Sequence, residues 1–239
     1  MLWFQRSSPT APDHRWGRSR CDVALRDGQD ERVLIRDWDR PIDEAEWRAF
    51  VTANAFGHLV AGGRDRTVPV VVPTQFVLDA DEVVLHLARP NPIWDAIAEN
   101  PTVVLSVAGD WAYVPSEWKA VGDEDPRRGI PTTYYAAAQI TGVAVVVDDP
   151  DEIAEVLRRQ LGDLQPELDA VDPVKHGARL RAIRGLRIPI ADVRAKFKYG
   201  ANVDDAHRRA VHERLLARGG PGDASAARHL ERRLGADGA

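Results

Sequence analysis

The residues best suited to chemistry lie where a short alternating apolar run passes into an amphipathic segment, at residues 83–97 (VVLHLARPNPIWDAI). The run ends in His86, Arg89 and Asn91, and the two prolines among them suit the first turn of a helix but not its interior. A cation and an amide beside a helix N-terminus favour an anion, because the first backbone amides are unpaired there and the helix dipole is positive. The segment therefore predicts a phosphate or carboxylate site. The alternative is an ordinary strand-to-helix turn with a surface arginine.

The composition limits the kind of protein. The 239 residues are 44% hydrophobic and 29% charged with a net charge of −5, which allows a sizeable core and argues against a generally basic nucleic-acid surface. The only cysteine, Cys21, excludes an internal disulfide and a cysteine-rich zinc site, and Met1 is the only methionine. No apolar run is long enough to span a bilayer and no signal-peptide pattern is evident, so we expect a cytoplasmic protein.

Three segments differ in character along the chain. Residues 1–32 lack helical or strand periodicity and are rich in Arg, Asp, Ser, Pro and Gly, which predicts a disordered N-terminal extension. Residues 33–203 carry the periodic patterns of a folded domain. Residues 204–239 are rich in Arg, Ala and Leu and predict a helical C-terminal tail, with GGPGD at 219–223 as a hinge between two helices.

Periodicity within the domain predicts many strands and few helices. We expect strands at 57–62, 67–78, 82–88, 102–109, 111–114, 136–149 and 186–200, the last interrupted by Pro189. We expect helices at 43–54, 92–100, 150–164 and 172–182. Asp43 and Glu46 have the spacing of a capping box at the start of the first helix. The pattern favours an antiparallel barrel decorated by helices over a doubly wound parallel sheet.

Four parts of the chain match one known family in order and spacing. They are AFGHLVAGG (55–63), HLARPNPIW (86–94), AYVPSEW (112–118) with IPTTYYAAAQITGVAVVVDDP (130–150) after it, and KFKYGAN (196–202). Together they resemble the PaiB family, whose members are described as FMN-binding negative transcriptional regulators. The resemblance implies an α+β, mainly β fold, the split β-barrel of flavin reductases, with FMN bound at a homodimer interface. The function it implies first is that of a flavin-linked oxidoreductase or a negative transcriptional regulator.

The resemblance and the residue chemistry together predict the cofactor site. The FMN phosphate needs fixed positive charge and free backbone donors, which Arg89, Asn91 and the following helix start offer. Lys196 and Lys198 alternate on one strand and therefore share a face, where they either add charge or form a solvated surface. The predicted cofactor-binding residues are His86, Arg89, Asn91, Thr132, Thr133, Tyr134, Lys196 and Lys198. For the three hydroxyls, the alternative is a strand start satisfied by its own backbone.

The chain departs from the family at positions expected to face the pocket. Residues 71–73 read Val-Val-Pro where the family has His-Leu-Pro, and residues 131–135 read Pro-Thr-Thr-Tyr-Tyr where it has Pro-Thr-Trp-Asn-Tyr. Gly200 and Ala201 replace a Ser-Gln pair, and His58 stands where threonine is usual. These changes leave the identity of the cofactor open.

Two other functions remain open from the sequence. Piperazate synthases resemble PaiB proteins but bind heme and form an N–N bond in N-hydroxy-ornithine, and here His86 or His58 would be the axial ligand. The third hypothesis for the function is a DNA-binding repressor without a cofactor. The arginines available to it after residue 204 are Arg208, Arg209, Arg214, Arg218, Arg228, Arg232 and Arg233. The acids interleaved with these arginines favour a salt-bridged tail or dimer arm, and no helix-turn-helix is evident.

Overall fold

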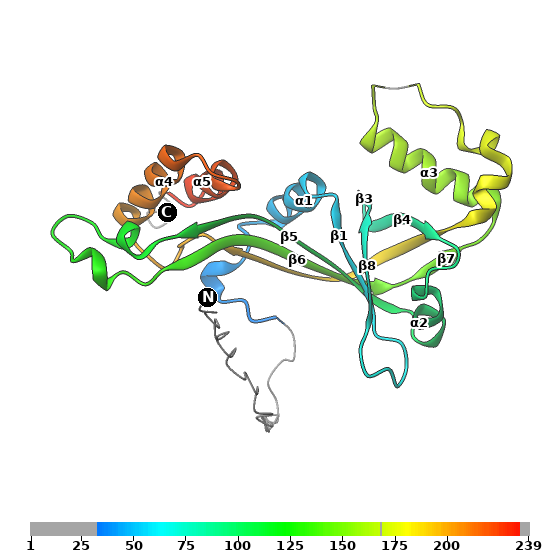
Figure 1. The fold of residues 1–239 in the computed structure, drawn as a ribbon, viewed down its shortest axis with the longest axis horizontal. Helices are drawn as coiled ribbons and strands as arrows, with labels where there is room; N and C mark the ends of the chain where they lie inside the picture. The colour runs from blue at the N-terminus through cyan, green and yellow to red at the C-terminus, as the bar shows by residue number, and fades with distance from the viewer. Residues whose placement is uncertain (1–32, 168, 235–239) are drawn as a thin grey trace, which may run out of the picture. The chain divides into compact units, whose positions relative to one another are not determined.

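An antiparallel sheet carries the fold of this computed structural model, which describes residues 33–167 and 169–234 (Figure 1). The expected disordered extension, residues 1–32, lies outside the described residues. The strands are β1 (Phe56–Ala61), β2 (Val70–Gln75), β3 (Val77–Asp79), β4 (Glu82–Ala88), β5 (Thr102–Val114), β6 (Thr132–Val143), β7 (Val145–Val147) and β8 (Ile183–Lys198). The α-helices are α1 (Glu44–Ala53), α2 (Ile93–Glu99), α3 (Pro150–Leu164), α4 (Asp205–Arg218) and α5 (Asp223–Glu231). Short 3₁₀ segments are η1 (Asp37–Asp39), η2 (Ser116–Lys119), η3 (Pro126–Arg128) and η4 (Pro173–Ala182).

The strand order makes the sheet curl into a split barrel. The order is β2-β1-β5-β6-β8-β4-β3, with β7 paired to β8 off this path. The two edge strands, β2 and β3, follow each other in the chain with only Phe76 between them. The sheet must therefore bend until its two edges meet at that residue. The predicted fold class, a helix-decorated split β-barrel, is confirmed.

Strand β8 joins the two halves of the sheet. Its first half pairs with β4, from Ile183 opposite Ala88 to Pro189 opposite Glu82, and its second half pairs with β6. The predicted interruption at Pro189 is wrong, because β8 runs unbroken through it. The proline lies where β8 changes partners, so its missing amide removes no bond from the interior of a ladder.

Other expected strands have different limits for local reasons. The run at 67–78 is divided into β2 and β3 at Phe76, whose amide donates to the Ala55 carbonyl at 3.2 Å and whose ring is fully buried. The two runs at 102–114 form the single strand β5, with a bulge between Gly109 and Ala112 that absorbs the extra residues. The helix expected at 172–182 is a pair of 3₁₀ turns broken at Gly177.

Helices cover one face of the long strands. Figure 1 shows α1, α4 and α5 on the same side of β5 and β6. Phe50 of α1, Leu215 of α4 and Leu230 of α5 are buried in the same core as Phe197 of β8. Helix α1 begins where Asp43 accepts a hydrogen bond from the Glu46 amide at 2.8 Å, as the capping pattern predicts. In the described part of the chain, no helix combines the length and apolar character needed to cross a membrane.

Candidate functional site

The predicted phosphate anchor before α2 is already occupied by groups of the protein itself. Arg89 donates from Nε to the Arg181 carbonyl at 2.8 Å and from Nη2 to the Ile183 carbonyl at 3.3 Å. Its Nη1 lies 2.7 Å from a carboxylate oxygen of Asp148. Asn91 accepts the Ile93 amide at 3.1 Å, so its side-chain oxygen occupies the first backbone amide of α2.

The two candidate iron ligands lie in different environments. His86 on β4 is half-buried, and its Nδ1 is 2.5 Å from Oε1 of Gln160 on α3. His58 is exposed on β1, opposite Pro73 and Ser106 of the neighbouring strands. Among the described residues there is no group of three or more His, Cys, Asp or Glu side chains arranged to hold a metal ion.

A second set of predicted residues lines a pocket of about 560 Å³ at the far end of β8 from Arg89. Its walls come from Arg36 and the η1 turn with Asp39, the end of η2, the start of β6, the end of β8 and the first turns of α4. The Asp39 carboxylate pairs with Lys196 rather than with Lys119 or Lys198. The residues that line the pocket include Lys119, Thr132, Tyr134, Lys198, Gly200 and His207. The volume lies within the roughly 300–1,000 Å³ of pockets that bind cofactors and other small molecules.

The pocket holds two lysines that lack acidic partners. Lys198 Nζ donates to the Thr132 hydroxyl at 2.7 Å, and Lys119 Nζ lies 3.5 Å from the Tyr134 hydroxyl. Among the described residues, no carboxylate forms an ion pair with either ammonium group. Burial lowers the pKa of Lys119, and the positive charge of Lys198 lowers it further. An anion in this pocket would relieve the repulsion between the two lysines and satisfy the hydroxyl donors.

Tyr134 and Gly200 explain two of the departures from the family pattern as one coupled change. Tyr134 is buried where the family has asparagine, and burial raises its pKa to about 12. Gly200 has a φ of 72°, and a Cβ built on it would lie 2.4 Å from the Tyr134 hydroxyl oxygen. The larger side chain at 134 therefore requires the glycine at 200, which also suits the positive φ.

The remaining predicted residues lie outside this pocket. Thr133 is exposed, because alternate residues of β6 point to opposite faces. Lys196 donates to the Leu34 carbonyl at 2.9 Å and lies 3.7 Å from a carboxylate oxygen of Asp39. Arg89 contacts the first residue of β8 whereas Lys198 is the last of its 16 residues, a strand length of roughly 50 Å. One protomer therefore cannot bring Arg89 and Lys198 to the same small cofactor.

Lys119 is one of the pocket residues that the sequence patterns missed. It ends the 3₁₀ turn η2, where no strand or helix periodicity points to a shared face. One signal was available in the composition. Of the 32 basic residues only four are lysines, and two of these, Lys119 and Lys198, line the pocket.

The comparisons with known proteins bear on the family and the fold. The sequence profile of a family described as "Putative FMN-binding domain" matches residues 38–192. The chain is 27% identical over 193 residues to the protease synthase and sporulation protein PAI 2 of Bacillus subtilis (strain 168), covering 77% of this chain and 90% of that protein.

Two solved structures show the same fold. The flavocytochrome Anf3 from Azotobacter vinelandii has a TM-score of 0.54 and 22% identity over 72% of this chain and 75% of its own. The FAD and heme binding protein from Mycobacterium smegmatis has a TM-score of 0.51 and 19% identity over 67% of this chain and 73% of its own. The fold is that of the split-barrel proteins. Within that class, the chain belongs to the PaiB family of FMN-binding domains.

Proposed function

We propose that the protein binds FMN and that the pocket around Lys119 and Lys198 receives the phosphate. The observation that carries the proposal is the pair of lysines in a pocket of suitable size, without a carboxylate partner among the described residues. Two ammonium groups with the hydroxyls of Thr132 and Tyr134 match a dianion with several acceptor oxygens. The profile match to an FMN-binding family supports flavin as the molecule that carries this dianion. The flavin would supply redox chemistry when bound.

The test compares two ligands that differ only in the phosphate. FMN and riboflavin are titrated against the purified protein, and quenching of flavin fluorescence gives each Kd. We expect FMN to bind at least about tenfold more tightly than riboflavin, because only FMN reaches both lysines with a charge. The Lys198→Met variant should remove most of this difference, whereas Lys175→Met, which changes an exposed lysine outside the pocket, should not. Equal affinities for the two ligands in the wild-type protein would contradict the phosphate assignment.

The proposal includes a homodimer, which the family resemblance implies. The sheet face opposite the helices carries exposed apolar side chains, with Phe56 62% and Val71 50% exposed on adjacent strands. A second copy of the chain would remove these side chains from water. Sedimentation should therefore give a dimer mass, and Phe56→Glu should lower it to that of a monomer. A monomeric wild-type protein would contradict this part of the proposal.

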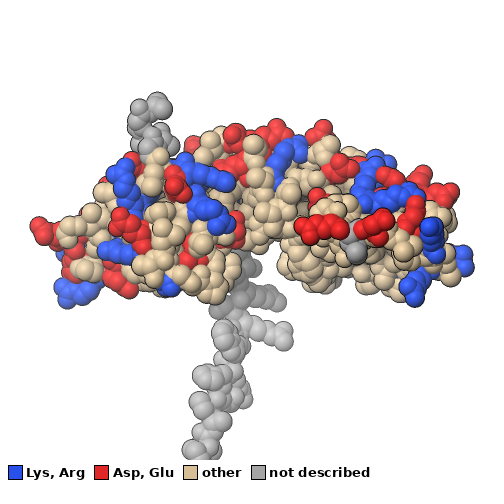
Figure 2. Space-filling model, turned by 90° about the horizontal axis from the view of Figure 1, so that it is seen from above, with Lys and Arg blue, Asp and Glu red and all other residues tan. Residues whose placement is uncertain are grey.

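Between the two roles open to a flavin-binding member of the family, a redox role has more support than DNA binding. Arg208 and Arg233 are buried and pair with Asp205 and Glu46, so they turn away from solvent. Figure 2 shows lysine and arginine side chains intermixed with acidic ones over the face in view. We expect a reduced nicotinamide nucleotide to bleach the absorption band of the bound flavin. A salt-dependent shift of DNA in a gel would favour the repressor instead.

Heme is the second candidate because of one specific contact. The bond between His86 Nδ1 and Gln160 fixes the orientation of the imidazole, so Nε2 is the nitrogen an iron would take. Heme titration would then give a Soret band that is lost in His86→Ala and kept in His58→Ala. No Soret change in the wild-type protein would exclude this candidate.

A further inference from the structure

We propose that α4 clamps the loop that carries Lys119, and that His207 is a positioning residue for this lysine. The inference rests on the proposed phosphate pocket and names the element that holds one of its two cations in place. Helix α4 lies beyond residue 192, where the match to the family profile ends. It nevertheless supplies part of the pocket wall, through His207 and Val211.

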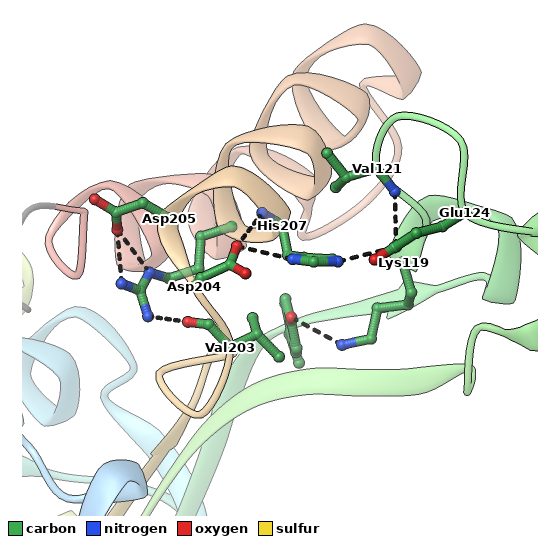
Figure 3. A network of polar contacts seen from close by, with 9 residues as sticks. Lys119, Val121, Glu124, Val203, Asp204, Asp205 and His207 are labelled. Atoms are coloured by element: carbon green, nitrogen blue, oxygen red, sulfur yellow. Dashed lines mark hydrogen bonds and ion pairs between the residues drawn. The ribbon is translucent and has the colours of Figure 1, made fainter.

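The first part of the clamp is an imidazole between two carboxylates (Figure 3). His207 Nδ1 lies 2.8 Å from a carboxylate oxygen of Asp204, and Nε2 lies 3.1 Å from one of Glu124. An ionised carboxylate only accepts hydrogen bonds, so the ring makes both bonds at once only when it is an imidazolium. The same Glu124 oxygen accepts the Val121 amide at 3.0 Å. His207 thus fixes the backbone fold of the loop two residues after Lys119.

The second part of the clamp holds the residue just before Lys119. Arg214 of α4 donates from Nη1 to the Trp118 carbonyl at 2.6 Å, and the Arg218 guanidinium lies 4.6 Å from the centre of the Trp118 ring. The other end of the loop closes tightly, since a Cβ on Gly129 would lie 1.9 Å from the Ser116 carbonyl oxygen. Lys119 therefore extends from a loop held on both sides, and α4 supplies the contacts on either side of it.

The clamp makes ligand binding depend on pH in a definite direction. Hydrogen bonds with Asp204 and then with Glu124 raise the pKa of His207. A raised folded-state pKa means that the stabilisation is complete below the ordinary value and is lost as pH rises through the raised one. The pKa values of Asp204 and Glu124 are lowered, so on the acid side the clamp is lost only as pH falls through those lowered values. It is therefore closed in mildly acidic solution and opens in alkaline solution.

The experiment measures FMN affinity from about pH 6 to about pH 9 for the wild type, His207→Gln and His212→Gln. The FMN phosphate also titrates towards the acid end of this range, so the effect of the clamp is measured as the difference in affinity between the variants. We expect His207→Gln to weaken FMN binding by about tenfold at about pH 6 and the two curves to converge at alkaline pH. His212→Gln changes the same residue type elsewhere on α4 and should follow the wild type. Identical curves for the wild type and His207→Gln would overturn the proposal.

A second measurement needs no flavin. Hydrogen exchange of the segment 116–129 should be faster in His207→Gln and in Glu124→Ala, which removes the same contact from the loop side. Unchanged exchange in both variants would overturn the clamp. If the wild type binds FMN, faster exchange in a variant that keeps full FMN affinity would also overturn it. If the wild type binds no FMN, the function proposal fails, and exchange of this segment alone decides whether α4 clamps the loop.

Discussion

The turn at residues 86–91 and the pocket around Lys119 and Lys198 both gather cations, but they treat the charge in opposite ways. Arg89 has an acidic partner in Asp148 and two carbonyl acceptors, so its charge already stabilises the fold. Lys119 and Lys198 face each other's charge in a pocket, where they bond to the hydroxyls of Tyr134 and Thr132 and form no ion pair with a carboxylate of the described residues. From this difference we expect the pocket, rather than the turn at residues 86–91, to bind an anion. A cation is better suited to bind an anion when no carboxylate of the protein already pairs with it.

The largest expected effect separates the two regions by ligand binding. The double variant Lys119→Met/Lys198→Met should weaken FMN binding by about 100-fold or more, since each charge-assisted bond to a phosphate contributes about 1.5–3 kcal/mol. Arg89→Met should change the Kd by less than about threefold. Fluorescence titration measures both, with Lys175→Met as a control for the loss of a surface lysine. If Arg89→Met weakened FMN binding strongly and the double variant weakened it little, the phosphate site would lie at the turn and not in the pocket.

These two regions also show what the sequence can and cannot predict. Apolar alternation predicts the strands, and the spacing of Asp43 and Glu46 predicts the start of α1, because both are local patterns. The pattern around Arg89 predicts an anion site, and that stays a prediction, but it does not show the protein groups that Arg89 contacts in the fold. Its partners Asp148 and Arg181 lie far along the chain, and no local pattern shows that they meet it. Lys119 was missed for the same reason, since its loop meets Lys198 only through the pairing of β5, β6 and β8.

The next largest effect is on the free energy of unfolding, at glycines with a positive φ. Gly200→Ala should lower the free energy of unfolding by about 3 kcal/mol, because the new Cβ meets both a positive φ and the Tyr134 hydroxyl. Gly177→Ala, in the segment that supplies the Arg181 carbonyl, also has a positive φ but meets nothing within 4 Å. It should cost only about 1 kcal/mol. Urea unfolding measures both losses. Adding Tyr134→Phe should recover part of the loss in Gly200→Ala and none of that in Gly177→Ala.

Arg89 should matter for stability where it does not matter for binding. Arg89→Met removes two bonds to carbonyls and the ion pair with Asp148, and we expect a loss of about 1 kcal/mol because the site is partly exposed to water. The urea midpoint measures the loss. The hydrogen bond from Arg89 is the first cause of the lowered pKa of Asp148. That pKa should therefore rise towards its ordinary value in the variant, and a carbon-detected NMR titration would follow it. No change in either quantity would mean that this arginine is a solvated surface residue.

The smallest expected effect is a gain in stability, from a substitution in the pocket. Lys119→Met should raise the free energy of unfolding by about 0.5 kcal/mol at neutral pH, because it removes a partly buried charge that faces Lys198. Since burial and then Lys198 lower the pKa of Lys119, the unfolded chain binds more protons than the folded protein between the lowered pKa and the ordinary value of about 10.4. The wild type should therefore gain stability relative to Lys119→Met as pH rises through this range. Saturating FMN should reverse the order at neutral pH, since only the wild type keeps both cations for the phosphate. If Lys119→Met were less stable than the wild type in the absence of FMN, Lys119 would stabilise the folded protein, as we expect for Arg89.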